Sequence, residues 1–189
     1  MKIVHCGEPG YVRFIKTWKW LLMIICSLIA IVVFAYGYAV SKGNRLNLFS
    51  LFAALIMLPA VKSVVGIVVT LPYHSVKKKT AEEVLQKTAA GQCRIFTDFL
   101  MSSTEQMMYA DFVAVAGRNV ILFCASRPKD AAKISAYLTA EFKTRKLNFN
   151  IRQMDDLEKF THYCAGAADP GDPHETAAVC SYLKSLIYK

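Results

Sequence analysis

Long apolar runs dominate the first part of the chain. The segment WLLMIICSLIAIVVFAYGYAV, residues 20–40, has 21 residues without a charge, and a helix of that length crosses the roughly 30 Å hydrocarbon core of a bilayer. A second apolar run, residues 46–71, is interrupted by Pro59 and Lys62. The pattern therefore predicts two transmembrane helices, at 20–40 and 48–73. We expect a kink near Pro59, because proline removes a helical hydrogen bond.

The segments around these two helices predict their orientation. Residues 41–47, SKGNRLN, contain the Gly and Asn of a tight turn. Basic residues are more numerous at the two outer ends of the pair than in this link, and positive charge favours the cytoplasmic side of a membrane. We therefore expect an integral membrane protein, in the plasma membrane if the source is prokaryotic. Its parts would be a cytoplasmic N-terminal segment at 1–19, an external turn at 41–47 and a cytoplasmic domain at 77–189.

After the hairpin the apolar residues recur at shorter periods. The segment 80–91, TAEEVLQKTAAG, begins with Thr80 as a capping residue and ends on Gly91, which predicts a short helix. Three stretches rich in β-branched and aromatic residues follow and predict consecutive strands. A helix capped by Asp130, a fourth strand at 147–154 and two closing helices come next. The predicted fold is a two-helix transmembrane hairpin plus a small α/β (α+β) domain, in the order αβββαβαα.

The formal net charge of +9 is concentrated around the predicted membrane helices. Residues 1–76 carry a net +6, Lys77, Lys78 and Lys79 add +3, and residues 80–189 hold thirteen basic and thirteen acidic side chains. A nucleic-acid-binding domain normally shows a basic excess of its own, so this distribution argues against a nucleic-acid partner. Basic residues beside a membrane helix suit the lipid bilayer and its anionic headgroups instead. We expect Lys77, Lys78 and Lys79 to meet such headgroups.

Metal-binding patterns are weak in this sequence. The six cysteines are scattered without a CxxC pair, and zinc requires several ligands at short spacing, so we expect neither a metal nor a cofactor. Asp155, Asp156 and Glu158 stand near His162, and this group forms either a metal or acid/base site or the start of a helix. We favour the helix N-terminus, where acids satisfy free amides and the macrodipole.

The sequence leaves several roles open for the cysteines. Cys164 and Cys180 are candidate partners across two packed helices, although buried cysteines are also ordinary core residues. A cysteine paired with His162 or His174 is a further alternative, without a local signature for any pairing. Neither a GxSxG elbow nor a Gly-rich phosphate loop occurs. The sequence therefore favours a protein that is not an enzyme.

The segment TEQMMYADFVAVAGRNVILFCASR, residues 104–127, together with the order of elements, resembles the core of the restriction-endonuclease-like fold, most of all its nuclease-related domain branch. In that family an Asp opens the second strand and Glu-x-Lys ends the third. Asp111 matches the Asp, but Cys124 and Ser126 stand where the family carries Glu and Lys. Metal-dependent phosphodiester hydrolysis needs two carboxylates and a cation. The resemblance therefore implies a fold that has lost catalytic residues, with Asp111 as the candidate catalytic residue if activity is retained.

Lys62 is the one charged residue inside a predicted membrane helix. Such a residue is a functional hypothesis by default, but no acid lies in either helix to pair with it. Its position also allows the ammonium to reach the headgroup region along its apolar stem. Several small residues in the hairpin would allow close approach of helices, in this chain or between copies. They are Gly37, Ala53, Ala54, Ala60 and Gly66.

Together these patterns favour a small membrane protein of bacterial type, with a non-enzymatic cytoplasmic interaction or scaffold domain on a two-helix anchor. It would act through a protein partner or as a homo-oligomer packed through its hairpin. One alternative is a divergent nuclease-like hydrolase using Asp111, or a cysteine-based one. Another is a small subunit of a membrane complex, in which Lys62 meets an acid on a partner.

Overall fold

The computed structural model describes residues 4–5, 7–40, 48–103, 106–145, 147–167 and 172–188. The chain forms two compact units. One unit is a helical hairpin, residues 13–74, and the other is an α/β domain made from residues 1–12 and 75–189. The predicted external turn at 41–47 lies outside the described residues.

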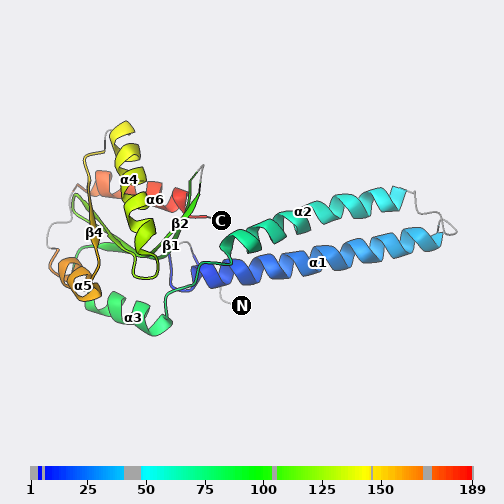
Figure 1. Ribbon diagram of the computed structural model, residues 1–189, viewed down its shortest axis with the longest axis horizontal. Helices are drawn as coiled ribbons and strands as arrows, with labels where there is room; N and C mark the ends of the chain where they lie inside the picture. The colour runs from blue at the N-terminus through cyan, green and yellow to red at the C-terminus, as the bar shows by residue number, and fades with distance from the viewer. Residues whose placement is uncertain are drawn as a thin grey trace. The chain divides into compact units, whose positions relative to one another are not determined.

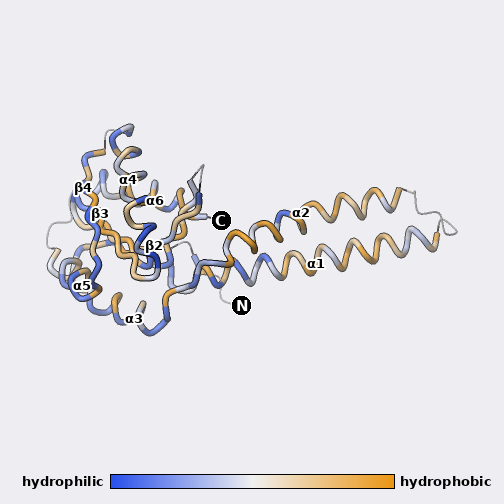
Figure 2. The backbone as a smooth tube through the Cα atoms, in the orientation of Figure 1, coloured by the Kyte–Doolittle hydropathy of each residue, from blue (hydrophilic) through white to orange (hydrophobic). Residues whose placement is uncertain are grey.

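Two long helices form the hairpin, α1 (Tyr11–Val40) and α2 (Leu48–Thr70). Both are long and apolar enough to cross a membrane, and Figure 2 shows apolar residues along most of their length. They run antiparallel and side by side (Figure 1), with the ring of Tyr36 5.6 Å from that of Phe49. The helix α2 continues through Pro59, whose carbonyl accepts a hydrogen bond from the Ser63 hydroxyl at 2.9 Å.

The first helix begins at Tyr11, well before the uncharged run at 20–40. Its added turns carry Arg13, Lys16 and Lys19, and long basic side chains are good helix formers. The helix starts directly after Gly10, whose φ of +89° is left-handed backbone that glycine adopts without strain. An apolar run thus locates the span, whereas the backbone conformation decides where the helix begins.

Small residues line the contact between the two helices. A side-chain carbon added to Gly66 would lie 2.5 Å from the Lys19 ammonium nitrogen, so the lysine passes directly over this glycine. Ala30 and Ala53 are also buried and line one shared groove. Of the small residues singled out in the sequence, Gly37, Ala53, Ala60 and Gly66 are buried, and Ala54 is exposed.

A four-stranded mixed sheet forms the centre of the α/β domain. Its strands are β1 (Arg94–Ser102), β2 (Met107–Ala116), β3 (Asn119–Phe123) and β4 (Asn150–Met154), in the order β1-β2-β3-β4. The first three are antiparallel neighbours, and β4 lies parallel to β3. A parallel pair requires a crossover, which helix α4 (Pro128–Thr144) supplies.

Helices cover both faces of this sheet (Figure 1). One face packs against α3 (Lys78–Lys87) and α5 (Leu157–Ala165), where Phe112 and Phe123 each lie 5.9 Å from the ring of Phe160. The other face carries α4 and α6 (Pro173–Leu186). Because both faces are covered, β2 is buried along nearly its whole length. The predicted fold class and the order αβββαβαα are confirmed.

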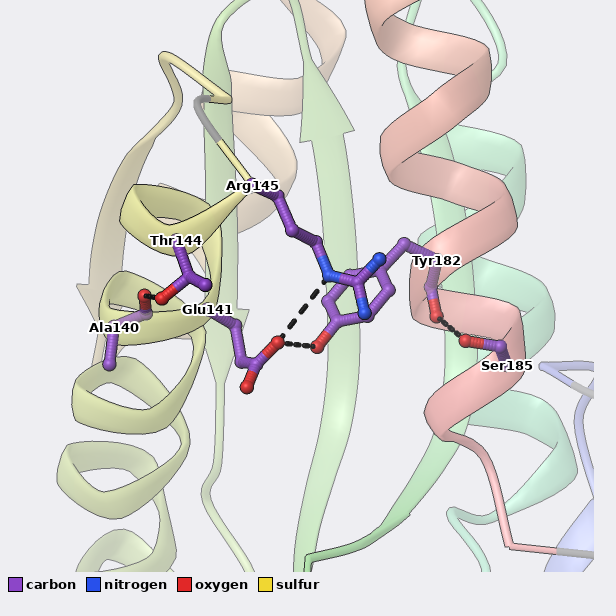
Figure 3. Close-up of polar contacts among 6 residues, drawn as sticks. All are labelled: Ala140, Glu141, Thr144, Arg145, Tyr182 and Ser185. Carbon is purple, nitrogen blue, oxygen red and sulfur yellow. Dashed lines mark hydrogen bonds and ion pairs between the residues drawn. The ribbon is translucent and has the colours of Figure 1, made fainter.

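Helices α4 and α6 are joined by a polar cluster around Tyr182 (Figure 3). The Tyr182 hydroxyl donates to the Glu141 carboxylate at 2.9 Å, and Arg145 contacts the same carboxylate oxygen at 3.4 Å. The Arg145 guanidinium also lies 4.2 Å from the centre of the Tyr182 ring. Burial, followed by the bond to Glu141, raises the pKa of Tyr182. The tyrosine therefore stays protonated and keeps donating.

The predicted caps of α3 are wrong. Lys77 occupies the N-cap and Thr88 the C-cap, so Thr80 lies inside the helix and Gly91 beyond it. Gly91 has a different role, because a side-chain carbon there would overlap the backbone carbonyl of Cys164. The glycine permits close contact between the start of the sheet and α5.

The predicted cap of α4 is wrong as well. Arg127 is the N-cap, Pro128 opens the helix, and Asp130 lies within the first turn. The Asp130 carboxylate accepts a hydrogen bond from the backbone amide of Tyr109 at 3.2 Å. The helix macrodipole favours a carboxylate both at the N-cap and in the first turn. In the first turn the Asp130 carboxylate also reaches strand β2.

Candidate functional site

Asp111, the candidate catalytic residue, lies on β2 and is 4% exposed. One carboxylate oxygen accepts from the Ser126 amide at 2.8 Å, and the other accepts from the Ser126 hydroxyl. Both oxygens thus bind the turn that follows β3. This geometry is that of a buried turn cap, which stabilises the end of the strand.

Cys124 lies beside the same carboxylate and is buried. Burial first, and then the charges of Asp111 and Asp130, raise its pKa to about 12. A thiol in this state is protonated at neutral pH and is a poor nucleophile. The structure therefore brings Asp111, Cys124 and Ser126 together, as an acid hydrogen-bonded to a serine beside an inert thiol.

Two further thiols form a pair that the sequence does not indicate. Cys93 precedes β1, Cys164 lies in the last turn of α5, and their side chains are hydrogen-bonded to each other. This bond lowers the pKa of Cys93, whereas the same bond and burial raise the pKa of Cys164. Long separation in the sequence hides such a pair from any motif.

Of the two alternatives for Cys164 and Cys180, the structure favours separate buried core residues over a pair. Cys164 belongs to the core between the sheet, α3 and α5, whereas Cys180 lies on α6 and interacts with Arg94 and Lys184. The two helices cover opposite faces of the sheet. Among the described residues, no histidine contributes to the pKa shifts of these thiols.

The acidic groups near His162 and His174 begin helices. The Asp156 carboxylate accepts from the Glu158 amide at 2.9 Å as the N-cap of α5. The Asp172 carboxylate accepts from the His174 amide at 2.9 Å as the N-cap of α6. The helix N-terminus that the sequence favours near His162 is confirmed. Within the part of the chain that the structure describes, no cluster of three or more His, Cys, Asp or Glu side chains could hold a metal.

Two surface hollows lie on either side of His162 and Tyr163, which line both. The first, of about 480 Å³, also includes the β2–β3 turn with Arg118, and the end of α5 with Gly166. The second, of about 530 Å³, lies over the start of α5 and includes Lys159. Mixed charges and a partly exposed aromatic ring are suited to a protein contact.

Asp98 is fully buried on β1 and was missed by sequence reasoning. Its carboxylate accepts hydrogen bonds from the amides of Gly10 and Val76, each at 2.8 Å, and from the Tyr109 hydroxyl at 3.0 Å. Burial, and then the charges of Asp98 and Asp111, raise the pKa of Tyr109, which therefore remains a donor. Gly10 directly precedes α1, and Val76 follows α2. Asp98 thus fixes to the sheet the two chain segments that lead into and out of the hairpin.

The lysines singled out in the sequence are all exposed. Lys62 projects from α2 outside the row of buried small residues. Lys77 is the N-cap of α3, and Lys78 and Lys79 form its first turn, which contains no acid. Cations at a helix N-terminus oppose the macrodipole. These three lysines therefore do not stabilise helix α3 through its macrodipole.

The fold and these sites define a class of protein: a helical hairpin long and apolar enough to span a membrane, joined to a three-layer α/β domain. No family model, no curated protein and no solved structure matches the chain. The resemblance to the restriction-endonuclease-like fold stays a prediction.

Proposed function

We propose that the protein is a membrane-anchored interaction or scaffold protein, with the hairpin inserted in the bilayer and the α/β domain on the cytoplasmic side. The observation that carries the proposal is the distribution of exposed large hydrophobic side chains. Among the described residues they all lie between Trp18 and Leu71, except Leu85. In water such a surface would be strongly unfavourable, whereas in lipid it is the expected one.

The basic residues support the proposed orientation. Lys77, Lys78 and Lys79 are exposed directly after the hairpin, at a helix end where the macrodipole disfavours them. Anionic headgroups offset this cost, since each basic residue near such a surface gains about 1 kcal/mol. The positive charges at the outer ends of the hairpin favour the cytoplasmic side in the same way.

An interaction role is favoured over hydrolysis by the state of the candidate catalytic groups. Asp111 uses both carboxylate oxygens on Ser126, and Cys124 is held as a neutral thiol. The hollows beside His162 and Tyr163 offer a contact surface instead. A protein partner at this surface is the proposed ligand of the domain.

Membrane insertion is tested by alkaline carbonate extraction of membranes that contain the full chain, followed by trypsin digestion of sealed vesicles. We expect the protein to remain in the pellet, and the α/β domain to be cleaved in inside-out but not in right-side-out vesicles. Recovery in the carbonate supernatant would contradict the anchor. Cleavage from the outer side would contradict the orientation.

The contact surface is tested by a double variant, His162→Ala with Tyr163→Ala, in quantitative co-purification from cross-linked membranes. Proteins that depend on this surface should be lost from the variant and retained by Lys133→Ala, a control on helix α4. Retention of every co-purifying protein by the double variant would contradict a role for this surface.

A second candidate, a small subunit of a membrane complex, is favoured by the exposure of Lys62 on α2. An outward-facing lysine within an apolar helix can meet an acid on a neighbouring protein. Lys62→Leu should then release the protein from a larger detergent-solubilised assembly, whereas Lys62→Arg should not. Unchanged size for Lys62→Leu would leave snorkelling to the headgroups as its role.

A further inference from the structure

The hydrogen-bonded thiols of Cys93 and Cys164 are fixed by close backbone contacts on either side. The amide of Gln92, next to Cys93, donates to the carbonyl of Ala167 at 3.1 Å. Gly91 packs so tightly against the carbonyl of Cys164 that no side-chain carbon fits there. The chain just before β1 and the end of α5 are therefore held together, with the two sulfur atoms between them.

The two thiols differ in accessibility. Cys164 is fully buried, whereas Cys93 is partly exposed at the edge of the core. The hydrogen bond between the two thiols lowers the pKa of Cys93. The thiolate is the reactive form of cysteine. A reagent from solvent would therefore reach the more reactive sulfur first.

We propose that Cys93 and Cys164 form a reversible disulfide, with Cys93 as the site that reacts with a hydroperoxide and Cys164 as the thiol that resolves it. This inference does not depend on the membrane anchor or on a protein partner.

In the first step the Cys93 thiolate attacks the terminal oxygen of the hydroperoxide. The O–O bond breaks, the leaving oxygen takes a proton and departs as an alcohol or water, and Cys93 becomes a sulfenic acid. In the second step the sulfur of Cys164 attacks the sulfur of Cys93. The S–O bond breaks, and the hydroxyl leaves as water with the Cys164 proton. Two thiols and one hydroperoxide thus give one disulfide, one alcohol and one water.

The bond would cross-link the last turn of α5 to the start of β1. Gly166 and Ala167, which line the hollow beside Tyr163, directly follow Cys164. Oxidation would therefore hold one wall of that hollow in place. A cellular dithiol can reverse the step by thiol–disulfide exchange.

The experiment uses the full chain in detergent, reduced and then titrated with hydrogen peroxide. Free thiols are blocked, and the protein is digested without reduction for peptide mapping by mass spectrometry. We expect one major cross-linked peptide joining Cys93 to Cys164, lost on treatment with dithiothreitol. Cys180→Ser, which removes a thiol on the opposite face, should form the same cross-link.

Two nearly isosteric variants separate the steps. Cys164→Ser should stop at the sulfenic acid of Cys93, which dimedone traps, and Cys93→Ser should leave Cys164 unmodified. In the unsubstituted protein, alkylation of Cys93 at neutral pH should be at least about tenfold faster than that of Cys124, because a raised pKa suppresses the thiolate. This last measurement needs no variant.

Three results would overturn the proposal. They are the absence of the Cys93–Cys164 peptide at peroxide concentrations that oxidise the exposed methionines, preferential pairing of Cys93 with a different cysteine, and alkylation of Cys93 no faster than that of Cys124.

Discussion

The hairpin and the α/β domain differ in the size of the side chains that they bury. In the domain the largest side chains are buried, with Phe99, Phe112 and Phe160 at or below 1% exposure. In the hairpin most of the large side chains are exposed, such as Leu28 at 58%, and most of the buried residues of α2 are small. Figure 2 shows that apolar residues predominate along the hairpin, whereas apolar and polar residues are mixed in the domain.

The difference shows how the solvent selects what a helix buries. In water, removal of apolar area is the main driving force, so the largest side chains gain most from burial. In lipid no such force acts between helices, and close packing of small residues takes its place. With the hairpin in lipid, as proposed above, one chain contains two cores built by different physical rules.

The largest expected effect comes from truncating a core aromatic. Phe160→Ala should lower the free energy of unfolding of the domain by about 3–5 kcal/mol, because it leaves a cavity against two other rings. Leu28→Ala in the hairpin removes a side chain that faces outward, and should leave domain stability unchanged. Hydrogen exchange of the β2 amides measures both. An equal loss of domain stability in the two variants would contradict this difference between the two units.

The next effect concerns Asp98, which binds the chain segments before and after the hairpin within the α/β domain. Asp98→Ala should destabilise the domain by about 3 kcal/mol, because it removes the acceptor of the buried Tyr109 hydroxyl and of the partly buried amides of Gly10 and Val76. Asp98→Asn is the matched control, since asparagine keeps an acceptor and tolerates the φ of +53° at this position. Urea unfolding followed by hydrogen exchange compares them. An alanine variant as stable as the asparagine variant would show that the contacts do not matter.

A smaller effect is expected from pH. The pKa of Cys124 is raised to about 12 in the folded domain, whereas an unfolded cysteine titrates near 8.5. The unfolded state therefore releases this proton first, and the contribution to stability is complete below about pH 8.5 and is lost as the pH rises toward 12. At pH 10 the loss should be about 2 kcal/mol. Cys124→Ser should flatten this part of the pH–stability curve, and an identical slope in the variant would assign the titration to other groups.

The smallest expected effect tests the hairpin contact. Gly66→Val places a side chain against Lys19, whose flexible tip can move, so the cost should be about 1–2 kcal/mol. Val65→Ala, on the exposed side of α2, is the control. The two tryptophans of the chain, Trp18 and Trp20, lie in α1, so thermal unfolding in detergent followed by tryptophan fluorescence reports on the hairpin. A larger loss of thermal stability for Val65→Ala than for Gly66→Val would contradict the assignment of the buried and exposed sides of α2.

Local patterns predicted the elements well. Uninterrupted apolar runs located both hairpin helices, and β-branched stretches located β1, β2 and β3, because each pattern depends on neighbours along the chain. The start of α1 at Tyr11 was missed, since charged residues on a helix interrupt an apolar run without ending the helix. The caps at Thr80 and Asp130 were wrong, because α3 and α4 begin after Lys77 and Arg127, and neither of these residues forms a side-chain capping hydrogen bond.

The sequence by itself determined the apolar hairpin, the order αβββαβαα and the concentration of positive charge around the hairpin. These features follow from composition and from periods of a few residues. Only the tertiary structure decided that Asp111 binds Ser126, that Asp98 receives the amides of Gly10 and Val76, and that Cys93 meets Cys164. Each of these contacts joins distant positions, and their partners are selected by how strands and helices pack against one another, which no local pattern of residues encodes.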